Sequence, residues 1–316
     1  VLDLFAQGGA IRGWPQDRVY DLFAKAFAED QLLALKTLFY LRDVRGGQGE
    51  RKTFQTCIKY LADYYPQIVR KNLDLFAEYG RWDDLLSLHD TKVWGEALML
   101  IDRQLKEDLN AWGDGKPQSL LSKWLPSINA SSKKTKMLAR RICKGLKYTY
   151  KDYRRTLSTL RKGKIVEKHM CSKEWEEIKY DQVPSQAMLR YRNAFSKNDK
   201  ERFGEFIGDV KTGKKEIKAD TLYPSQIVGK VRSLGMRSED ELDVLDAQWN
   251  ALPNYLENNP HRGLAVVDVS GSMTHGYNQT AAVPMDVAIS LGLYFAERNE
   301  CPVFGNSFIT FSDNPQ

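Results

Sequence analysis

The feature that most constrains the fold is a succession of amphipathic helical segments separated by short turns. Apolar residues recur at helical spacing in residues 16–28, 31–42 and 93–110, and Gly or Pro residues interrupt the pattern between such segments. Helix pairs joined by short turns stack into solenoids of the HEAT or armadillo type, because each pair buries its apolar face on the next. The alternation therefore predicts a mainly α-helical repeat domain over residues 1–258, although no clean sequence period is visible.

A different pattern begins at residue 259. The apolar run at 264–267 is typical of a strand buried on both faces of a parallel sheet. It leads into an oxygen-rich loop at 268–272, and Pro284 then suits the first turn of a helix. Strand, loop and helix in this order build ligand sites in open α/β sheets. We therefore expect residues 259–316 to be the start of an α/β, Rossmann-like domain, truncated after a second strand at 307–311.

The loop after the first strand has the composition of a cation site. Asp268 supplies a carboxylate, and Ser270 and Ser272 supply hydroxyl oxygens. Oxygen ligands suit a hard cation, Mg²⁺ before Ca²⁺ or Mn²⁺. The alternative is an Asp/Ser/Gly turn without a ligand. A hydrolase nucleophile elbow is excluded because Asp268 occupies the position of its first Gly. Since no acid/base pair or nucleophile constellation is readable, we expect no enzymatic activity.

Positive charge is concentrated in residues 133–168. This segment holds 14 Lys/Arg residues and two acids, a balance of +12, whereas the whole chain carries +6. Apolar residues keep a 3.6-residue period over 133–162, which predicts one long helix with a buried face and a cationic remainder. Such an excess is the footprint of phosphate binding, and the alternative is a solubilising or protein-binding face. The candidate RNA-binding residues are Lys133, Lys134, Lys136, Arg140, Arg141, Lys144, Lys147, Lys151, Arg154, Arg155, Arg161 and Lys162.

A glycine-rich loop at residues 46–49 is a second candidate for anion binding. It lies beside Arg45, Arg51 and Lys52, but it lacks the spacing of a P-loop and follows a helix instead of a strand. An inter-helix turn is the simpler interpretation. The three cations keep an anion-binding role open.

Cysteine usage and hydropathy indicate a cytoplasmic protein. The four cysteines are far apart and form no C-x-x-C pair, so we expect reduced, buried thiols and no zinc site. No apolar run approaches the roughly 18 residues of a membrane span, so no membrane partner is expected.

Several motifs carry a resemblance to a known family. The strand and D-x-S-x-S loop at 264–273 resemble the metal-ion-dependent adhesion site (MIDAS) of von Willebrand factor A (vWA) domains. Four further motifs lie in the helical part: Arg42-Asp43-x-Arg45-Gly46-Gly47-x-Gly49-Glu50-Arg51, Glu78-Tyr79-Gly80-Arg81-Trp82-Asp83-Asp84, Tyr153-Arg154-x-x-Leu157-x-x-Leu160-Arg161 and Val183-Pro184-Ser185-x-Ala187-Met188. Together the layout resembles the TROVE proteins of the Ro-autoantigen class, in which a helical repeat ring precedes a vWA domain. The detailed match is closest to an uncharacterised branch of that architecture in plants, fungi, bacteria and large DNA viruses or phages.

The resemblance implies a function. Ro-type proteins bind small noncoding RNAs and misfolded RNAs on a basic surface. A ribonucleoprotein scaffold is therefore expected, which holds noncoding or single-stranded RNA and uses its metal site to recruit an acidic protein partner. The alternative is a metal-dependent protein–protein adaptor, or a viral or phage structural protein, with no specific RNA role.

Overall fold

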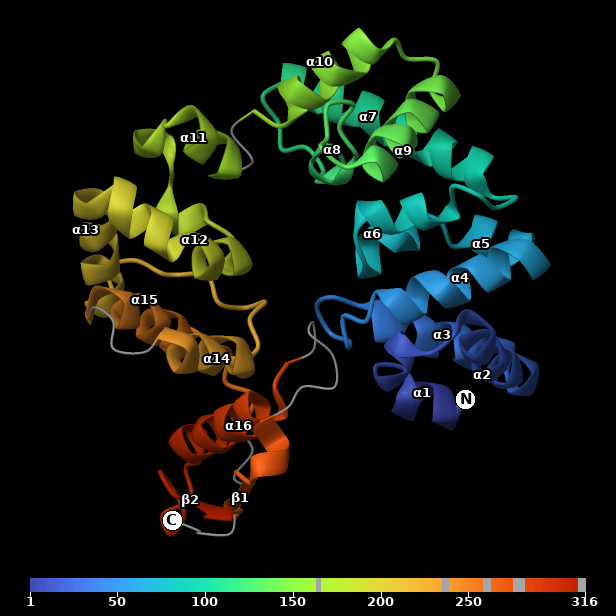
Figure 1. Ribbon diagram of the computed structural model, residues 1–316. Helices are drawn as coiled ribbons and strands as arrows, with labels where there is room; N and C mark the ends of the chain where they lie inside the picture. Colours follow the sequence, from blue (N-terminus) through green and yellow to red (C-terminus); the bar gives the residue numbers. More distant parts are fainter. Residues whose placement is uncertain (163–165, 235–238, 258–262, 275–281, 312–316) are drawn as a thin grey trace. The chain divides into compact units, whose positions relative to one another are not determined.

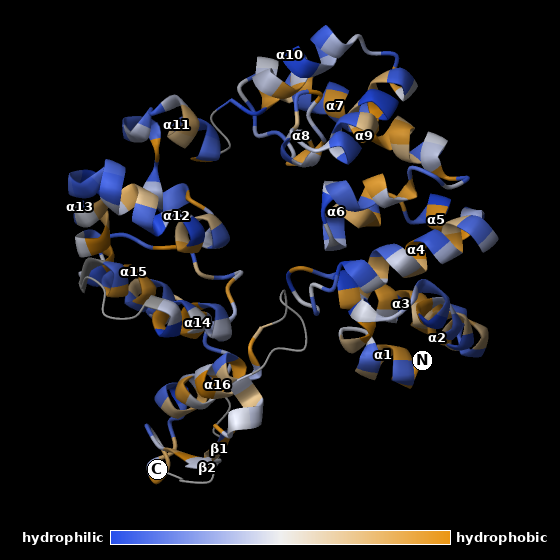
Figure 2. Cartoon of the chain, in the orientation of Figure 1, coloured by the Kyte–Doolittle hydropathy of each residue, from blue (hydrophilic) through white to orange (hydrophobic). Residues whose placement is uncertain are grey.

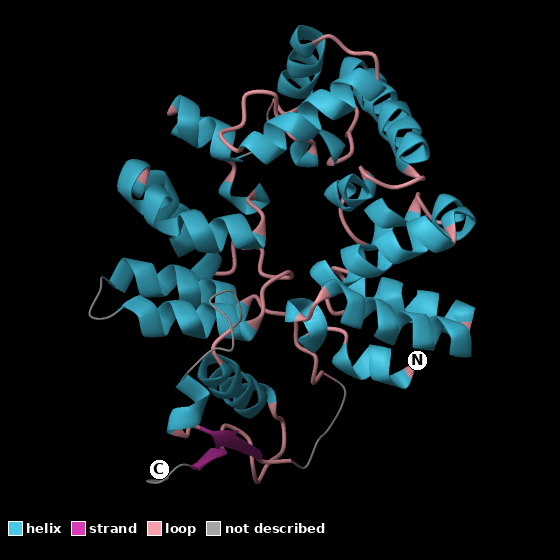
Figure 3. Cartoon of the chain, turned by 45° about the vertical axis from the view of Figure 1, so that its right-hand side comes forward, coloured by secondary structure: helices cyan, strands magenta, loops and turns pink. Residues whose placement is uncertain are grey.

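The protein is mainly helical and contains one small parallel sheet, as predicted (Figures 1 and 3). The computed structural model describes all residues except 163–165, 235–238, 258–262, 275–281 and 312–316. The chain divides into two compact units, Val1–Ile165 and Val166–Gln316.

The described part of the first unit consists of helices that share one apolar core. Phe23, Leu38, Phe54, Phe76 and Tyr153 are fully buried in that core. Figure 2 shows the amphipathic character that drives this packing, with apolar and polar residues on different sides of the helices. The elements are α1 (Leu2–Gln7), η1 (Ala10–Gly13), α2 (Gln16–Glu29), α3 (Gln31–Arg42), α4 (Lys52–Tyr64), α5 (Pro66–Lys71), α6 (Leu75–Tyr79), η2 (Trp82–Leu88), α7 (Trp94–Gly113), α8 (Leu121–Trp124), α9 (Lys133–Gly145) and α10 (Tyr150–Leu160).

The second unit joins further helices to the sheet. Helix α16 packs on both α14 and β1, and Tyr294 of α16 donates a hydrogen bond to the carbonyl of Pro253. The helices between residues 166 and 250 and the two strands after residue 262 therefore belong to the same compact unit. Its elements are α11 (Val166–Ser172), η3 (Trp175–Glu177), η4 (Tyr180–Gln182), α12 (Ser185–Asn198), α13 (Lys200–Lys211), α14 (Pro224–Leu234), α15 (Glu239–Asn250), β1 (Ala265–Asp268), η5 (Gly271–Thr274), α16 (Pro284–Arg298) and β2 (Phe308–Phe311).

The predicted helices at 16–28, 31–42 and 93–110 are confirmed by α2, α3 and α7. Local chemistry explains the sharp start of α3, because the Asp30 carboxylate accepts a hydrogen bond from the backbone N–H of Leu33 at 2.9 Å.

The prediction of one long basic helix over 133–162 is wrong. Helix α9 ends at Gly145, and α10 begins at Tyr150 after an N-cap in which Thr149 accepts from the backbone N–H of Asp152. Between them Lys147 adopts a φ of 56°, and the backbone N–H of Tyr148 bonds to the carbonyl of Cys143 at 2.9 Å. This is a Schellman ending with lysine in the left-handed position where glycine is usual, so periodicity alone did not reveal it.

Gly145 fixes how closely α9 approaches α7. A Cβ at this position would lie 2.4 Å from Leu98 Cδ1, so only glycine fits without displacing the α7 side chain. The last turn of α9 therefore lies close to Leu98 of α7.

The sheet pairs β1 and β2 in parallel, with Ala265 opposite Phe308 and Asp268 opposite Phe311. Helix α16 covers one side, where Gly292 leaves room for Val267. The expected burial of β1 on both faces is wrong for the described residues, because Val266 remains 62% exposed. An apolar run predicted a strand, but it did not predict which side would be covered.

A buried carboxylate connects two motifs that lie about 40 residues apart in the sequence. Asp84 in η2 is fully buried and accepts hydrogen bonds from Arg42 Nε at 2.7 Å, Gln55 Nε2 at 2.9 Å and the backbone N–H of Arg81 at 3.0 Å. Arg51 Nε lies 3.3 Å away. These contacts join the end of α3, the start of α4 and η2 into one polar network, which fixes the turn at 43–51.

We expect Asp84→Ala to lower the free energy of unfolding by about 3–5 kcal/mol, because it leaves the Arg42 guanidinium buried without its partner. Urea denaturation measures this change. Asp74→Ala is the matched control, since it removes an exposed carboxylate paired with Arg103, and its cost should stay under about 1 kcal/mol. Equal losses in the two variants would contradict the role of the buried network.

Thiol reactivity should separate the four cysteines. Cys57 and Cys143 are buried, but Cys171 is exposed and Cys301 half-buried, so the expectation of four buried thiols is wrong. Burial raises the pKa of Cys143 to about 11 and also raises the pKa of Cys57. With Ellman's reagent at pH 8, we expect Cys171 to react fast and Cys57 and Cys143 to react only on unfolding. Cys171→Ser should remove the fast phase, and rapid reaction of Cys143 would contradict the packing.

Candidate functional site

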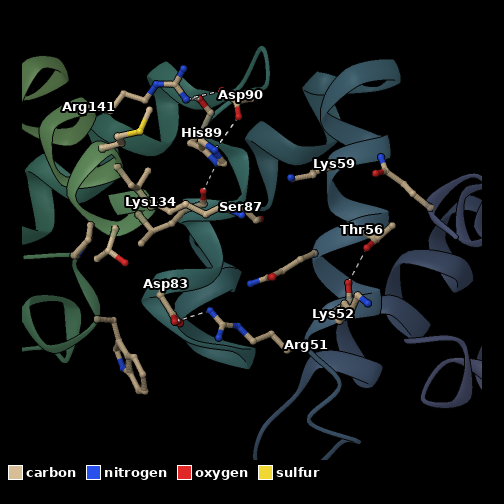
Figure 4. Close-up of a pocket in the computed structure, with 18 residues that line it drawn as sticks. Arg51, Lys52, Thr56, Lys59, Asp83, Ser87, His89, Asp90, Lys134 and Arg141 are labelled. Atoms are coloured by element: carbon tan, nitrogen blue, oxygen red, sulfur yellow. Dashed lines mark hydrogen bonds and ion pairs between the residues drawn. The ribbon is translucent and has the colours of Figure 1, made fainter. Parts of the chain in front are cut away.

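A groove of about 980 Å³ lies in the first unit between α4, η2 and α9. Figure 4 shows Lys52 and Lys59 on the α4 wall, with Lys134 and His89 on the facing wall. The groove is thus built from three segments that are distant in the sequence and are brought together by the core beneath them.

The lining of the groove has an excess of positive charge. It includes five Lys/Arg side chains and two carboxylates, those of Asp83 and Asp90. Among the described residues, no acid forms an ion pair with Lys52, Lys59 or Lys134. The unbalanced charge therefore comes from lysine ammonium groups on two opposite walls.

The two arginines of the groove are already held by carboxylates. Arg51 Nη2 lies 2.6 Å from Asp83, and Arg141 Nη1 lies 2.5 Å from Asp90, which also contacts His89 Nε2 at 2.8 Å. The hydrogen bond from Arg141 lowers the pKa of Asp90, helped by the nearby charges of His89 and Lys59. Asp90 therefore keeps its negative charge at neutral pH and positions Arg141 at the rim.

Arg81 connects the Arg51–Asp83 ion pair to the ring of Trp124. Asp83 also accepts from Arg81 Nη2 at 2.8 Å, and the Arg81 guanidinium lies 3.9 Å from the centre of the Trp124 ring. These contacts hold Arg51, Asp83, Arg81 and Trp124 together on one wall of the groove.

The structure does not assemble the predicted anion site at residues 45–52. Arg45 Nη1 donates to the carbonyl of Glu78, and Arg51 is paired as described. The Glu50 carboxylate caps α4 by accepting from the N–H groups of Lys52 and Thr53 at 2.9 and 3.2 Å. Since the helix N-terminus is occupied, of these three cations only Lys52 faces the groove without an acid partner among the described residues.

The same loop satisfies the geometry of a tight turn. A Cβ at Gly47 would lie 1.9 Å from the Tyr40 carbonyl oxygen, and Gly49 has a φ of 64°. Glycine is therefore required at Gly47 by the close backbone contact and favoured at Gly49 by the left-handed φ, which supports the interpretation of this loop as an inter-helix turn.

Most of the predicted basic residues lie on the surface of α9, α10 and the segments beside them. Lys136 is half-buried, and Arg141 is exposed but paired with Asp90. The guanidinium of Arg161 makes internal hydrogen bonds. It donates to the carbonyls of Ser122 and Leu125 and to Ser127 Oγ at 2.6–2.7 Å. Its burial lowers the pKa of its guanidinium. The remaining nine residues are exposed: Lys133, Lys134, Arg140, Lys144, Lys147, Lys151, Arg154, Arg155 and Lys162.

The tyrosines of this region differ in exposure. Tyr153 is fully buried and donates to the carbonyl of Pro126 at 3.0 Å, whereas Tyr150 is 53% exposed. Tyr148 is half-buried and packs edge-on against Tyr153. Tyr150 is thus the exposed aromatic ring of α10 among the described residues.

The oxygen-rich loop follows the carboxyl end of β1, as predicted from the strand pattern. Asp268 Oδ1 accepts from the backbone N–H of Ser270 at 2.9 Å, and Ser270 Oγ lies 3.1 Å from Ser272 Oγ. Hydrogen bonds from Ser270 lower the pKa of Asp268, so its carboxylate is ionised at neutral pH. One carboxylate and two hydroxyls here fit a hard cation in donor chemistry.

Two absences hold for the described part of the chain. It contains no group of three or more His, Cys, Asp or Glu side chains arranged to hold a metal ion. None of its helices combines the length and the apolar character that a membrane crossing requires.

Sequence reasoning missed the groove and Lys59. Lys59 lies on the polar side of an ordinary amphipathic helix, outside any basic run. The groove arises only when α4, η2 and α9 pack together, so neither charge clustering nor motif spacing signalled it. The pairing of Arg42 and Arg51 with Asp83 and Asp84 was equally hidden, although both motifs were visible.

Comparisons with known proteins give the family but no activity. A family model described as "Domain of unknown function (DUF2828)" matches residues 1–103 and 145–260. A second, described as "Domain of unknown function (DUF7788)", matches residues 262–316. An uncharacterized protein of Acanthamoeba polyphaga mimivirus is 30% identical over 93% of this chain. The chain spans 56% of the length of that relative, and no solved structure matches.

These matches correct the resemblance inferred from the motifs. The assignment to the TROVE proteins of the Ro class is wrong, because the family model that matches most of the chain is a different one. A helical domain followed by a D-x-S-x-S loop was not specific enough to identify the TROVE family. The chain belongs to the DUF2828 family.

Proposed function

We propose that the first unit binds RNA, single-stranded or structured, through phosphate contacts made by the cations of α9, α10 and their flanking residues. The observation that supports this most is the lack of neutralisation on these helices. Among the described residues, no acid forms an ion pair with eleven of the twelve candidate cations, the exception being Arg141, which pairs with Asp90. Arg161 is one of the eleven, but it is bonded internally to carbonyls and a hydroxyl. Exposed charge of one sign attracts a polyanion and releases its counterions on binding.

The basic helices favour backbone contacts over base recognition. Lysine and arginine side chains on a helix surface reach phosphates, whereas reading bases requires polar side chains and stacking rings at fixed places. Tyr150 is exposed and supplies one ring on which a base stacks. The proposed binding is therefore sensitive to salt and tolerant of sequence. It includes no chemical step.

Neutralising two cations of α10 should test this proposal. We expect Lys151→Gln with Arg154→Gln to weaken binding of a single-stranded oligoribonucleotide. The slope of log affinity against log salt should fall by roughly 1.4, about 0.7 for each lost phosphate contact. Fluorescence anisotropy between low and physiological salt measures both.

The control for this experiment removes the same charge elsewhere in the unit. Lys25→Gln with Arg103→Gln changes two exposed cations that pair with Asp21 and Asp74. Its RNA affinity should stay close to that of the unaltered protein. Unchanged binding in the α10 variant, or equal loss in both variants, would reject RNA binding by these helices and favour a solubilising face.

We further propose that β1, η5, α16 and β2 belong to a vWA-like domain, in which Asp268, Ser270 and Ser272 hold Mg²⁺ or a similar cation. The parallel pairing of β1 with β2, and the 3.1 Å separation of the two hydroxyls beyond the strand end, support this proposal. Such a cation offers an open coordination position to an acidic group of a protein partner. A metal-dependent adaptor is thus the second candidate function. The HEAT-like character of the helices stays a prediction.

Mn²⁺ is a suitable probe for this loop. We expect Asp268→Ala to abolish a Mn²⁺ site detected by electron paramagnetic resonance, whereas Asp246→Ala, an exposed carboxylate on α15, should leave it intact. Since the pKa of Asp268 is lowered, its carboxylate stays ionised and binding should not change between pH 8 and pH 5. Equal Mn²⁺ binding by the Asp268→Ala variant would assign the loop to a simple turn.

A further inference from the structure

The groove between α4, η2 and α9 differs from the exposed faces of the basic helices. It is concave, and its volume of about 980 Å³ suits a small ligand better than a rod-like duplex. Two of its unpaired lysines, Lys52 and Lys59, belong to α4, which lies outside the basic segment of residues 133–168. Only part of its charge therefore comes from that segment, through Lys134 and Arg141.

Positively charged side chains lie on both walls of the groove. Lys52 and Lys59 stand seven residues apart on α4, about two helical turns, so their side chains share one side of the helix. Lys134 stands on the facing wall, in the first turn of α9, and Arg141 lies two turns further along it. Cations thus line both walls along the length of the groove.

The acids of the groove do not cancel this charge. Asp83 is shared by Arg51 and Arg81, and Asp90 is shared by Arg141 and His89. Each carboxylate already faces two donors, and no described acid forms an ion pair with Lys52, Lys59 or Lys134, so the lining keeps a net positive charge. A ligand that fills it must bring several negative charges, spaced to meet both walls.

We propose that this groove binds a ligand with two or more adjacent phosphate groups, held between Lys52 and Lys59 on α4 and Lys134 on α9. Adjacent phosphates supply several negative charges within one small ligand, and lysine binds phosphate as a compact point charge without a fixed angle. The Ser87 and Thr56 hydroxyls line the same space, but they donate to the carbonyls of Asp84 and Lys52, so the lysines supply the contacts to phosphate. A free nucleoside polyphosphate supplies such adjacent phosphates. A nucleic-acid strand, whose single phosphates are separated by riboses, is the alternative that the titrations below distinguish.

Inorganic triphosphate is the direct probe, because it carries adjacent phosphates and no base. We expect Lys52→Gln with Lys59→Gln to weaken triphosphate binding at physiological salt by about tenfold or more, through loss of two charge-assisted hydrogen bonds. Isothermal titration calorimetry measures the affinity. Glutamine keeps much of the aliphatic stem, and thermal unfolding of each variant verifies that the fold is intact.

The α10 variant, Lys151→Gln with Arg154→Gln, is the matched control because it removes the same charge outside the groove. Its triphosphate affinity should stay within about twofold of that of the unaltered protein, allowing for weak long-range attraction at this salt. Absence of triphosphate binding by the unaltered protein, or equal weakening in the two variants, would overturn the proposal.

Two further titrations identify the source of the phosphates. Tighter binding of ATP than of triphosphate, without displacement by oligouridylate, would assign the groove to a free nucleotide. Displacement of triphosphate by oligouridylate, with weaker RNA binding in the groove variant, would assign it to a strand. The groove proposal and the RNA proposal fail separately, since the former is decided by the α4 lysines and the latter by the α10 cations.

Discussion

The fully buried carboxylate of Asp84 is the constraint on which the first unit depends. Burying a charge is costly unless it is paired and hydrogen-bonded, so Asp84 requires Arg42, Gln55 and the Arg81 backbone to converge on it. That convergence sets the path of the glycine-rich turn and the start of α4. It also places Arg51 beside Asp83, which forms one wall of the groove. A polar contact at the centre of the unit therefore determines the position of lysines that lie at its surface.

The charges of the first unit fall into three groups with different roles. Arg42 and Arg161 make internal hydrogen bonds that stabilise the fold. Arg51 and Arg141 are paired at the groove, where their carboxylates hold them in place. The lysines of α4, the cations of α9 other than Arg141 and the cations of α10 lack such partners among the described residues. Net charge alone does not separate these groups, because a lysine at the surface and an arginine under a loop contribute equally to it.

Much of the local structure was predictable from the sequence, and the tertiary arrangement was not. Helical periodicity placed α2, α3 and α7 well, and the apolar run before Asp268 predicted a strand. The break after Gly145 was missed because Lys147 takes a left-handed conformation that glycine usually adopts. The groove was missed because its walls lie far apart in the chain. The exposed Val266 was missed because an apolar run does not reveal which side of a strand is covered.

The contact of Gly145 with Leu98 has a consequence for association. Close approach of α9 to α7 restricts rotation of α9 about its own axis, so its cations project from a packed helix. A partner then meets charges that are already oriented, and less rotational freedom is lost when the complex forms. Preorganisation of this kind comes from a residue that bears no charge and contacts no ligand.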